Sequence, residues 1–388
     1  MERLVVHYSE IGTKGKNRKV FERILIKNIK RAIGGGISRV YRDYGRIVLY
    51  LDKNIDSEAV SKKLEKIPGI ANFMFATRSS LNIEEIKKKC IWVLNNITFK
   101  SFRISSSRSN KRFSVNSQEL NRIVGSYVIE KMDKVVDLEN PDVNVYVEIC
   151  EREAFIGIEK KKGVGGLPVG SSGKLICSLS GGIDSPVASW LMMKRGCKIV
   201  FGHIYNSTQT KEVLLEKVNS IVKQLSNFQL ESKIYVIPFE RIQKEIIIKI
   251  PAKFRMIIYR RFMMRILNEI AKKEKAKGIV TGDSIGQVAS QTIENLNCIY
   301  DASKLPVFAP LIGMSKEEII RLSREIGTYK YSIIDYPDCC SFMIAKHPET
   351  KGRIDIIKKL GESIENHKEL IKMCLGRASV KSIKSEDL

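Results

Sequence analysis

Residues 180–185, with the sequence Ser-Gly-Gly-Ile-Asp-Ser, join an apolar run to a helix-like pattern, and their types and spacing suit chemistry on a phosphate. The two glycines permit a tight turn in which successive backbone N–H groups and the start of the helix point at one anion. Ser180 and Ser185 add hydroxyl donors. Pro186 suits the first helical turn, because its missing N–H would have no partner there. The stretch therefore predicts a cradle for a phosphate group.

Asp184 brings a negative charge into this predicted anion site. A carboxylate is stable beside a phosphate when a cation lies between them, so we predict that Asp184 positions Mg²⁺. No Gly-Lys-Ser or Gly-Lys-Thr follows the glycines, which disfavours the type of loop that serves transfer of a γ-phosphate. The alternative is an ordinary turn between a strand and a helix, capped by a serine.

The cradle needs a strand before it and a helix after it, and the second half of the chain provides both. Apolar runs alternate there with helical stretches, at residues 174–180, 197–205, 232–239 and 277–284. Continuous apolar strands separated by helices indicate a parallel sheet covered on both faces, and ligands of such sheets lie beyond the carboxyl ends of the strands. We predict a doubly wound parallel-sheet domain over residues 174–388, with a helical, Lys-rich tail.

The first half of the chain predicts two smaller α+β units. Residues 1–77 alternate as strand, helix, two strands, helix and strand, which is the ferredoxin-like order. Residues 78–160 follow with a helix, a strand, a second helix and two strands. Residues 161–173 are rich in glycine and lysine without periodicity, so a linker is expected there.

Composition and charge limit the class of protein. Of the 388 residues, 43% are apolar and 28% charged, as in soluble globular proteins, and no apolar run reaches the ~20 residues of a membrane span. The start lacks a secretory signal, and the eight cysteines show no CxxC or zinc-type spacing, so a reducing, cytoplasmic location is expected. The net charge of +24 favours a polyanion partner, since residues 1–173 hold 32 Lys and Arg against 20 Asp and Glu and the remainder 35 against 23. The alternative is a basic, solvated surface.

The string SGGIDSPVA resembles the PP-loop of ATP pyrophosphatases, which cleave ATP to AMP and pyrophosphate while adenylating a substrate. Further stretches are similar, in the same order, to landmarks of the tRNA 4-thiouridine synthetases, the ThiI family: residues 7–22, 116–122, 281–296, 310–320, 326–329 and 338–342. The resemblance implies a ferredoxin-like domain, a THUMP RNA-binding domain and a PP-loop domain (adenine nucleotide alpha hydrolase-like). It also implies ATP, Mg²⁺, tRNA thiolated at uridine eight, and a further role in sulfur transfer for thiamine synthesis.

The same resemblance implies the residues that contact ATP. Together with the turn residues Ser180, Gly181, Gly182 and Ser185, the matching positions are Ser178, Leu179, His203, Ile204, Arg260, Gly282 and Gln291. Asp184 and Lys316 match catalytic positions, and a cation near the transferring phosphate would stabilise developing charge. Without the family motif, Lys316 would be interpreted as a helix-surface lysine and His203 as a packed strand residue.

Cys340 matches the cysteine that the family uses in sulfur transfer, in which a persulfide sulfur attacks the adenylated base. Residues 336–342 predict a turn that would expose this thiol. Cys339 is expected to support Cys340, and Cys177 to be buried in a strand. The sequence shows no rhodanese domain, so the persulfide would form on Cys340, come from a carrier such as a cysteine desulfurase, or be replaced by sulfide. The lack of CxxC disfavours an iron–sulfur cluster, and a homodimer rests on the resemblance alone.

Two basic groups in the first half are predicted to bind tRNA. The first lies in a loop and helix start, where backbone N–H groups also favour phosphate, and contains Lys14, Lys16, Arg18 and Lys19. The second contains Arg103, Arg108, Lys111, Arg112 and Arg122. Only Phe102 and Phe113 interleave with the second group, so recognition of shape and phosphate is favoured over base stacking. The alternative is a solvated basic face.

Two other functions stay open at this point. Another PP-loop ligase or amidotransferase would adenylate a small substrate, and pyrophosphate release without tRNA would favour it. A non-catalytic RNA-binding or sulfur-carrying protein is the second, and loss of ATP binding would favour it. The intact turn with Asp184 and Lys316 favours an enzyme.

Overall fold

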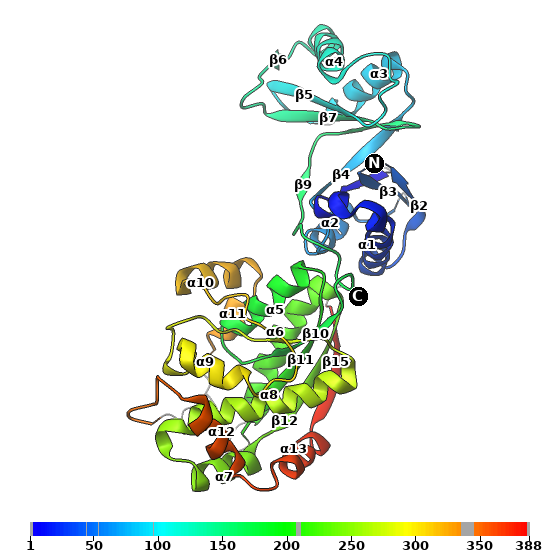
Figure 1. Ribbon diagram of the computed structural model, residues 1–388. Coiled ribbons are helices and arrows are strands. Elements are labelled where there is room, and N and C mark those ends of the chain that lie inside the picture. Colours follow the sequence, from blue (N-terminus) through cyan, green and yellow to red (C-terminus); the bar gives the residue numbers. More distant parts are fainter. Residues whose placement is uncertain are drawn as a thin grey trace. The chain divides into compact units, whose positions relative to one another are not determined.

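The computed structural model describes residues 3–43, 45–52, 54–95, 97–206, 211–334 and 345–385, with the backbone alone for 211–214. The chain forms two compact units, Met1–Pro168 and Val169–Leu388. Each has its own sheet, with nine strands in the first unit and six in the second among the described residues (Figure 1). Within these ranges no helix is long and apolar enough to cross a membrane.

The first part of the first unit has the predicted ferredoxin-like order. Its elements are β1 (Arg3–His7), η1 (Glu10–Asn17), α1 (Arg18–Ile33), β2 (Ile37–Asp43), β3 (Arg46–Leu51), α2 (Ser57–Leu64) and β4 (Asn72–Ser79). The strands lie in the order β2-β3-β1-β4, and each neighbouring pair is antiparallel. Residues 4–6 of β1 are fully buried. The side chain of Asp56 caps α2 by accepting hydrogen bonds from the N–H groups of Glu58 and Ala59.

The second part of the first unit extends the same sheet. It contains α3 (Ile83–Leu94), β5 (Ser101–Arg108), α4 (Ser117–Met132), β6 (Val135–Val136), β7 (Val143–Ile149), β8 (Ala154–Gly157) and β9 (Lys161–Lys162). The side chains of Asn82 and Asn116 cap α3 and α4. Strand β4 joins the two parts, because residues 72–76 pair with β1 and residues 77–79 pair with β8. Strand β9 lies in the stretch for which the sequence predicts a linker, and it pairs with the start of β4.

The second unit contains a mostly parallel sheet with many helices. Its elements are β10 (Lys174–Ser178), α5 (Asp184–Lys194), β11 (Lys198–Tyr205), α6 (Lys211–Gln229), β12 (Glu231–Pro238), α7 (Glu240–Lys249), η2 (Ala252–Phe254), α8 (Arg255–Glu274), β13 (Ile279–Val280), η3 (Ala289–Gln291), α9 (Ile293–Tyr300), β14 (Val307–Phe308), α10 (Lys316–Glu325), α11 (Tyr329–Ser332), α12 (Ile354–Glu362), α13 (His367–Gly376) and β15 (Ser379–Lys384). The strand order is β14-β13-β10-β11-β12-β15. The chain runs outward from β10 to β12 and returns to β13 on the other side of β10. The strand order therefore reverses at β10, where ligands of such sheets bind.

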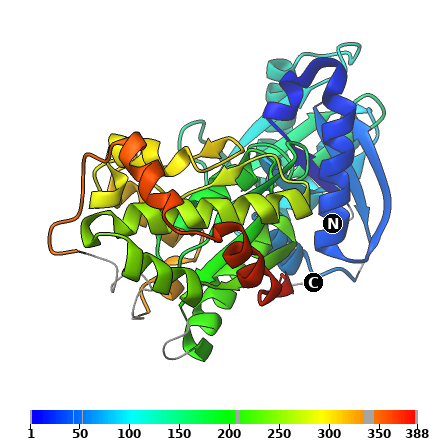
Figure 2. The same cartoon turned by 60° about the horizontal axis from the view of Figure 1, so that its bottom comes forward.

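Helices cover both faces of this sheet. Helices α5 and α6 contact each other, and they pack against β10, β11 and β12. Helix α8 contacts β10, β11 and β13, and Figure 2 shows it crossing the strands. Crossovers between parallel strands are nearly always right-handed, so helices on the outward and return paths cover opposite faces. The core between α8 and the sheet includes Ile176, Val200, Phe262 and Leu267, and the predicted doubly wound fold is confirmed.

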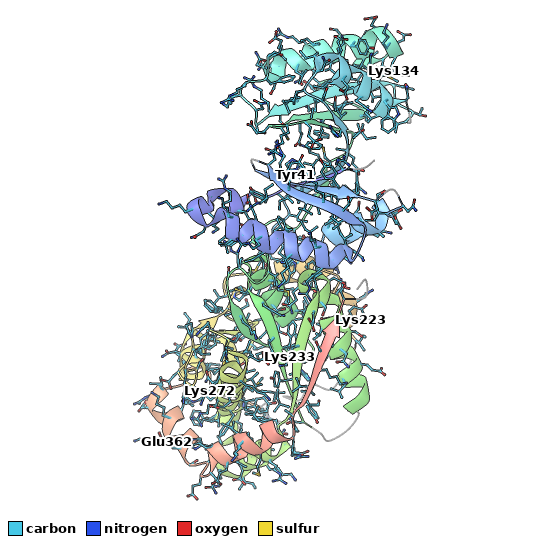
Figure 3. The ribbon with its side chains drawn as sticks, turned by 90° about the vertical axis from the view of Figure 1, so that its right-hand side faces the viewer. Tyr41, Lys134, Lys223, Lys233, Lys272 and Glu362 are labelled. Atoms are coloured by element: carbon cyan, nitrogen blue, oxygen red, sulfur yellow. The ribbon has the colours of Figure 1, made fainter. Side chains whose placement is uncertain are left out.

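Glu274, at the C-terminal end of α8, fixes this helix to the sheet. Its carboxylate accepts hydrogen bonds from Lys174 Nζ at 3.0 Å, from Tyr235 Oη at 2.7 Å and from Lys233 Nζ (labelled in Figure 3). Burial alone would raise the pKa of Glu274, but the hydrogen bonds from Lys233, Tyr235 and Lys174 lower it to about 2. The contacts hold α8 against β10 and β12, and α8 contributes one wall of the cavity described below.

The C-terminal tail is not entirely helical, contrary to the expectation from the sequence. The sequence predicts a helical tail, and α12 and α13 are present, but residues 379–384 form β15, which pairs antiparallel with β12. Most side chains of β15 are exposed, so its sequence carries little of the apolar alternation that indicates a strand. Pairing with the edge of an existing sheet, which sequence propensity does not report, determines its structure.

Candidate active site

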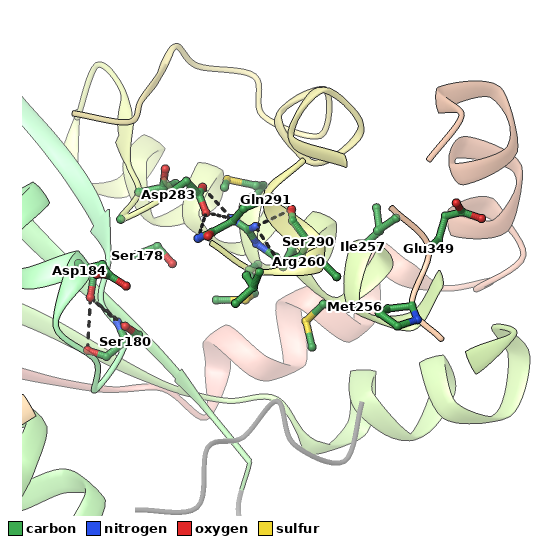
Figure 4. Close-up of a pocket in the computed structure, with 18 of the residues that line it drawn as sticks. Ser178, Ser180, Asp184, Met256, Ile257, Arg260, Asp283, Ser290, Gln291 and Glu349 are labelled. Atoms are coloured by element: carbon green, nitrogen blue, oxygen red, sulfur yellow. Dashed lines mark hydrogen bonds and ion pairs between the residues drawn. The ribbon is translucent and has the colours of Figure 1, made fainter. Parts of the chain in front are cut away.

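A cavity of about 510 Å³ opens at the carboxyl ends of β10 and β13, where the strand order reverses (Figure 4). It is lined by residues of four segments: the end of β10 with the turn after it, η2 with helix α8, the segment after β13, and residues 348–349. The lining includes seven of the residues that the sequence assigns to ATP or to catalysis, namely Ser178, Ser180, Asp184, Ser185, Arg260, Gly282 and Gln291. The structure therefore brings these seven together in one place.

The turn before α5 is organised by two serines. The Ser185 hydroxyl accepts a hydrogen bond from Ser180 N at 2.9 Å and lies 3.0 Å from the Ser180 hydroxyl. The Ser180 hydroxyl in turn accepts a hydrogen bond from Gly182 N at 3.3 Å. Helix α5 begins at Asp184, and the first N–H groups of a helix have no carbonyl partner within it. The fixed turn and the helix N-terminus together suit an anion.

Gly282 allows the segment after β13 to approach the N-terminus of α5. A Cβ atom at this position would lie 2.7 Å from Ser185 N and 2.9 Å from the carbonyl carbon of Asp184. These contacts are with backbone atoms, so a side chain at position 282 would push the two segments apart. The glycine therefore permits one continuous cavity between β10 and β13.

We expect Gly282→Ala to weaken ATP binding by about tenfold to hundredfold, because displaced cavity walls no longer fit one ligand. Calorimetric titration of ATP into the two proteins measures the effect. The matched control is Gly376→Ala at the end of α13, where an added Cβ would meet nothing within 4 Å. Wild-type affinity in the Gly282→Ala variant would contradict the requirement for close approach.

Asp283 is the centre of a polar network on one wall of the cavity. Its carboxylate accepts two hydrogen bonds of 2.7 Å from the Arg260 guanidinium. It also accepts one of 3.0 Å from Gln291 Nε2 and one of 2.7 Å from Tyr300 Oη. Burial alone would raise the pKa of Asp283, but the charge of Arg260 and the hydrogen bonds from Tyr300 and Arg260 lower it. The network thus fixes Arg260 and Gln291, whose side chains line the cavity (Figure 4).

Asp184 and Lys316 form an ion pair at the turn. Lys316 Nζ lies 2.7 Å from Asp184 Oδ1. A capping box between Ser315 and Glu318 defines the start of α10 and so places Lys316 in its first turn. The Lys316 side chain is 42% exposed and that of Asp184 24% exposed, so the pair adds little to stability. Each partner can therefore exchange the other for a ligand at small energetic cost.

Asp184 fits the predicted Mg²⁺. Among the described residues, no group of three or more His, Cys, Asp or Glu side chains could hold a metal ion. A Mg²⁺ here would therefore need oxygen atoms of the ligand, which is its usual arrangement: one or two carboxylates together with substrate phosphates and water. The carboxylate of Asp184, at the edge of the anion-type turn, supplies the required oxygen donors.

Three of the residues assigned to ATP lie behind the turn, outside the described lining of the cavity. Leu179, His203 and Ile204 are almost completely buried, and His203 Nδ1 lies 2.9 Å from the carbonyl oxygen of Leu179. They support the backbone at the ends of β10 and β11. Gly181 and Gly182 form the turn itself.

Three cysteines are candidates for the sulfur chemistry or lie next to the turn: Cys177, Cys339 and Cys340. Of these, Cys339 and Cys340 lie outside the described residues. Cys177 is fully buried in β10, as the sequence predicts, and burial raises the pKa of its thiol. A buried thiol of raised pKa is a packing residue rather than a nucleophile.

Sequence reasoning missed Asp283, Tyr300 and the apolar wall on α8. The wall includes Met256, Ile257 and Met263. Asp283 directly follows Gly282, just after a strand of the parallel sheet. This position was the one signal from which its place in the site could have been predicted. The residues of α8 have the spacing of any helix that packs on a sheet, so nothing in their pattern distinguishes a cavity wall from a core.

The first predicted basic group lies on η1 and the start of α1. Lys16 and Lys19 are exposed, and Lys14 is half-buried. Arg18 Nη2 donates a hydrogen bond of 2.6 Å to the carbonyl oxygen of Gly12, so Arg18 holds the loop that carries the lysines.

The second predicted basic group does not form one stripe. Arg103 and Arg108 lie near opposite ends of β5 and, five residues apart, on opposite faces of the strand. Arg103 donates to the carbonyl oxygen of Leu138, whereas Arg108 donates to those of Phe113 and Val115 and braces the turn before α4. The remaining members are exposed on this turn or on α4: Lys111, Arg112 and Arg122.

The anion-type turn at the reversal point of a doubly wound sheet defines a nucleotide-binding domain of the PP-loop class. Residues 170–366 match the family described as "Thiamine biosynthesis protein (ThiI)", residues 3–74 match the ThiI ferredoxin-like domain, and residues 81–159 match the THUMP domain. The chain belongs to the ThiI family, as the sequence motifs indicate.

Curated relatives and solved structures agree with this assignment. A "Probable tRNA sulfurtransferase" from Thermoanaerobacter pseudethanolicus is 41% identical over 94% of this chain and 96% of its own length. One from Acetivibrio thermocellus is 40% identical over 98% of each chain. A crystal structure of a 4-thiouridine synthetase–RNA complex with bound ATP superimposes with a TM-score of 0.89 at 36% identity, covering 99% of this chain and 100% of the other.

Proposed function

We propose that this protein is an ATP-dependent tRNA uracil 4-sulfurtransferase, which converts uridine at position eight of tRNA into 4-thiouridine. The observation that carries the proposal is the arrangement of Asp184 and Lys316 beside the serine–glycine turn, at one end of a cavity that Arg260 lines. The solved relative at 36% identity is a complex with RNA and bound ATP, which supports both ligands. The residue roles, the domain limits and the cytoplasmic location given above are part of this proposal.

The turn and Lys316 would serve the adenylation step. Uracil O4 is a poor leaving group, so the oxygen would first attack the α-phosphorus of ATP, and pyrophosphate would leave as the oxygen–phosphorus bond forms. Residues 180–185 would hold the pyrophosphate through backbone N–H groups. Lys316 would move from Asp184 to the phosphate oxygens that gain negative charge. When bound, Mg²⁺ would neutralise phosphate charge beside Asp184.

Cys340 would serve the sulfur step. The terminal sulfur of a persulfide on Cys340 would attack C4 of the base, and AMP would leave with the electrons of the C4–oxygen bond. The base would then be joined to Cys340 through a disulfide. A second thiol would attack the Cys340 sulfur, break this disulfide and release 4-thiouridine. A cysteine desulfurase persulfide would transfer its outer sulfur to Cys340. In the alternative, free sulfide would itself attack C4 and displace AMP, and no persulfide on Cys340 would form.

The first unit would bind the tRNA. The exposed members of the two basic groups are placed to contact backbone phosphates: Lys16, Lys19, Arg103, Lys111, Arg112 and Arg122. Arg18 and Arg108 already bond to carbonyl oxygens of their own loops, so their part would be to fix those loops. Homodimer formation is suggested by the family resemblance alone.

A reconstituted reaction tests the proposal. Purified protein is incubated with ATP, Mg²⁺, an unmodified tRNA transcript and a cysteine desulfurase with cysteine, and the digested nucleosides are analysed by mass spectrometry. We expect 4-thiouridine only when ATP and tRNA are both present, and none in a transcript with cytidine at position eight. Pyrophosphate release that is independent of tRNA would instead indicate adenylation of a small substrate.

A further inference from the structure

The first unit has another cavity, of about 200 Å³, to which the function proposed above assigns no role. Its lining contains three arginines, two tyrosines and one acid: Arg39, Arg78, Arg152, Tyr41, Tyr50 and Glu153. These residues come from β2, β3, β4 and the connection between β7 and β8. Segments far apart in the sequence therefore bring three positive charges to one small cavity.

Strand pairing places the lining residues of β2 and β3 on one face of the sheet. Arg39 of β2 lies opposite Tyr50 of β3, which lies opposite Arg3 of β1, and directly opposed residues of antiparallel strands share a face. The buried cluster on this face comes from strands and from the residue after β7: Val5, Val48, Met74, Ala76, Cys150 and Phe155. Among the described residues, no helix contributes to this cluster, and the three arginines of the cavity are exposed. Their guanidinium groups can therefore reach a ligand that approaches the sheet.

Two tyrosine rings hold Arg39 in position. Its Cζ atom lies 5.9 Å from the centre of the Tyr41 ring and 5.5 Å from that of the Tyr50 ring. Such cation–π contacts use none of the N–H hydrogen bonds of the guanidinium, so its donors remain for an anion. In the part of the chain that the structure describes, neither Arg39 nor Arg152 has a hydrogen bond or an ion pair. Both groups therefore keep their positive charge for a ligand.

Glu153 orients the other side chains of the cavity. It is 8% exposed, and its Oε1 accepts hydrogen bonds from Tyr41 Oη at 2.8 Å and Tyr50 Oη at 2.9 Å. Burial and the hydrogen bond to Glu153 raise the pKa of Tyr41 (labelled in Figure 3), so this hydroxyl stays protonated and donates. Glu153 Oε2 lies 2.8 Å from Arg78 Nε, which leaves the terminal N–H groups of Arg78 directed away from this contact. One carboxylate thus fixes three side chains of the cavity.

We propose that Arg39, Arg78 and Arg152 bind one backbone phosphate of the tRNA. This inference rests on the proposed function, because it takes the first unit to hold RNA. Glu153 balances the charge of Arg78, so two positive charges remain for the phosphate. Guanidinium groups bind phosphate oxygens through paired, charge-assisted hydrogen bonds, and the fixed arginines lose little freedom when they do so.

The aromatic rings of the cavity favour a phosphate over a stacked base. Arg3 Cζ lies 3.5 Å from the centre of the Tyr50 ring, and Arg39 lies over the same ring. A base could stack there only if it displaced a guanidinium. The site therefore adds a contact to the RNA backbone on the sheet, separate in sequence from the two predicted basic groups.

The salt dependence of tRNA affinity tests this inference, because each neutralised phosphate contributes about 0.7 to 0.9 to the slope of log K against log salt concentration. Fluorescence anisotropy of a labelled tRNA transcript with the full-length protein, at several KCl concentrations, measures both affinity and slope. We expect the double variant Arg39→Met, Arg152→Met to bind roughly tenfold to hundredfold more weakly, the range for loss of hydrogen bonds between charged groups. Its slope should be smaller by about 1.

Two further double variants separate geometry from charge. Arg39→Lys, Arg152→Lys keeps both charges without the guanidinium forks, so we expect the wild-type slope with an intermediate affinity. The matched control is Lys62→Met, Lys131→Met, which also removes two positive charges from the first unit. Both lysines are exposed and already paired, with Glu58 at 2.9 Å and Glu130 at 2.7 Å, so affinity and slope should change little.

Each outcome decides the inference. Wild-type affinity and slope in Arg39→Met, Arg152→Met would overturn it, and so would a weaker affinity without a change in slope, which indicates a structural effect. An equal loss in the Lys62 and Lys131 control would reduce the result to net charge and overturn it as well. Normal tRNA binding with lost binding of inorganic phosphate would assign the cavity to a free anion instead. A wild-type protein that does not bind the transcript would overturn the proposed function itself, whereas the other results leave 4-thiouridine formation untouched.

Discussion

Asp184→Asn is expected to reduce tRNA-dependent pyrophosphate release by about 10³-fold, the cost of losing one preorganised electrostatic group at a reacting centre. The substitution keeps the size of the side chain and removes its charge. It therefore removes the negative charge that pairs with Lys316, whose Nζ lies 2.7 Å from Asp184 Oδ1 in the wild-type protein. It also removes the carboxylate oxygens that suit Mg²⁺. The measurement is the rate of radiolabelled pyrophosphate formation in single turnover with saturating tRNA.

The control for this variant is Glu317→Gln. Glu317 follows Lys316 at the start of α10 and is exposed, so its replacement removes one negative charge nearby without changing the turn. We expect less than about a twofold change, because exposed charges contribute little. If Asp184→Asn kept more than a tenth of the wild-type rate, the role of Asp184 as the charged centre of the site would be wrong.

Cys340→Ala is expected to abolish 4-thiouridine formation while ATP is still cleaved. Alanine lacks the sulfur on which the persulfide would form, so the sulfur step stops. The adenylation step uses the turn and Lys316, and both remain in this variant. Mass spectrometry of tRNA nucleosides measures thiolation, and AMP formation in the same samples measures adenylation.

Cys339→Ala is the matched control, because it removes the neighbouring thiol at the adjacent position. We expect it to retain thiolation when a persulfide donor and a free thiol are supplied. Full activity of Cys340→Ala with the same donor would refute the sulfur-relay assignment, and loss of activity in Cys339→Ala alone would exchange the roles of the two cysteines.

The turn of residues 180–185 and the sheet around it could be predicted from the sequence, because both depend on local residue patterns. The glycines and serines of residues 180–185 specify a turn by themselves, and the buried parallel strands carry unbroken apolar runs. The ferredoxin-like order was equally visible, since the strands and helices of residues 3–79 differ in their apolar periods and Asp56 caps α2. Family resemblance then added the residues from distant segments, such as Arg260 and Gln291.

The features that escaped prediction depend on contacts between distant segments. Asp283 matters because Arg260, Gln291 and Tyr300 converge on it. This convergence of distant residues leaves no periodic pattern in the sequence.

The role of the two phenylalanines near the second basic group could not be predicted from the sequence either. Phe102 and Phe113 are both buried in the core of the first unit, so they support the fold rather than an RNA surface. Their spacing alone could not distinguish these two uses, because an aromatic side chain in a strand or turn serves either one.

Strand β4 has a consequence for how the first unit can be dissected. One half of this strand pairs with β1 and the other half with β8, so the ferredoxin-like and THUMP parts share a backbone ladder. A fragment containing only one of the two would expose an unpaired strand edge, which invites aggregation. The two family segments are thus separate in sequence but share one sheet within one compact unit. They are therefore expected to unfold together, and the smallest independently stable piece of this half is expected to contain both.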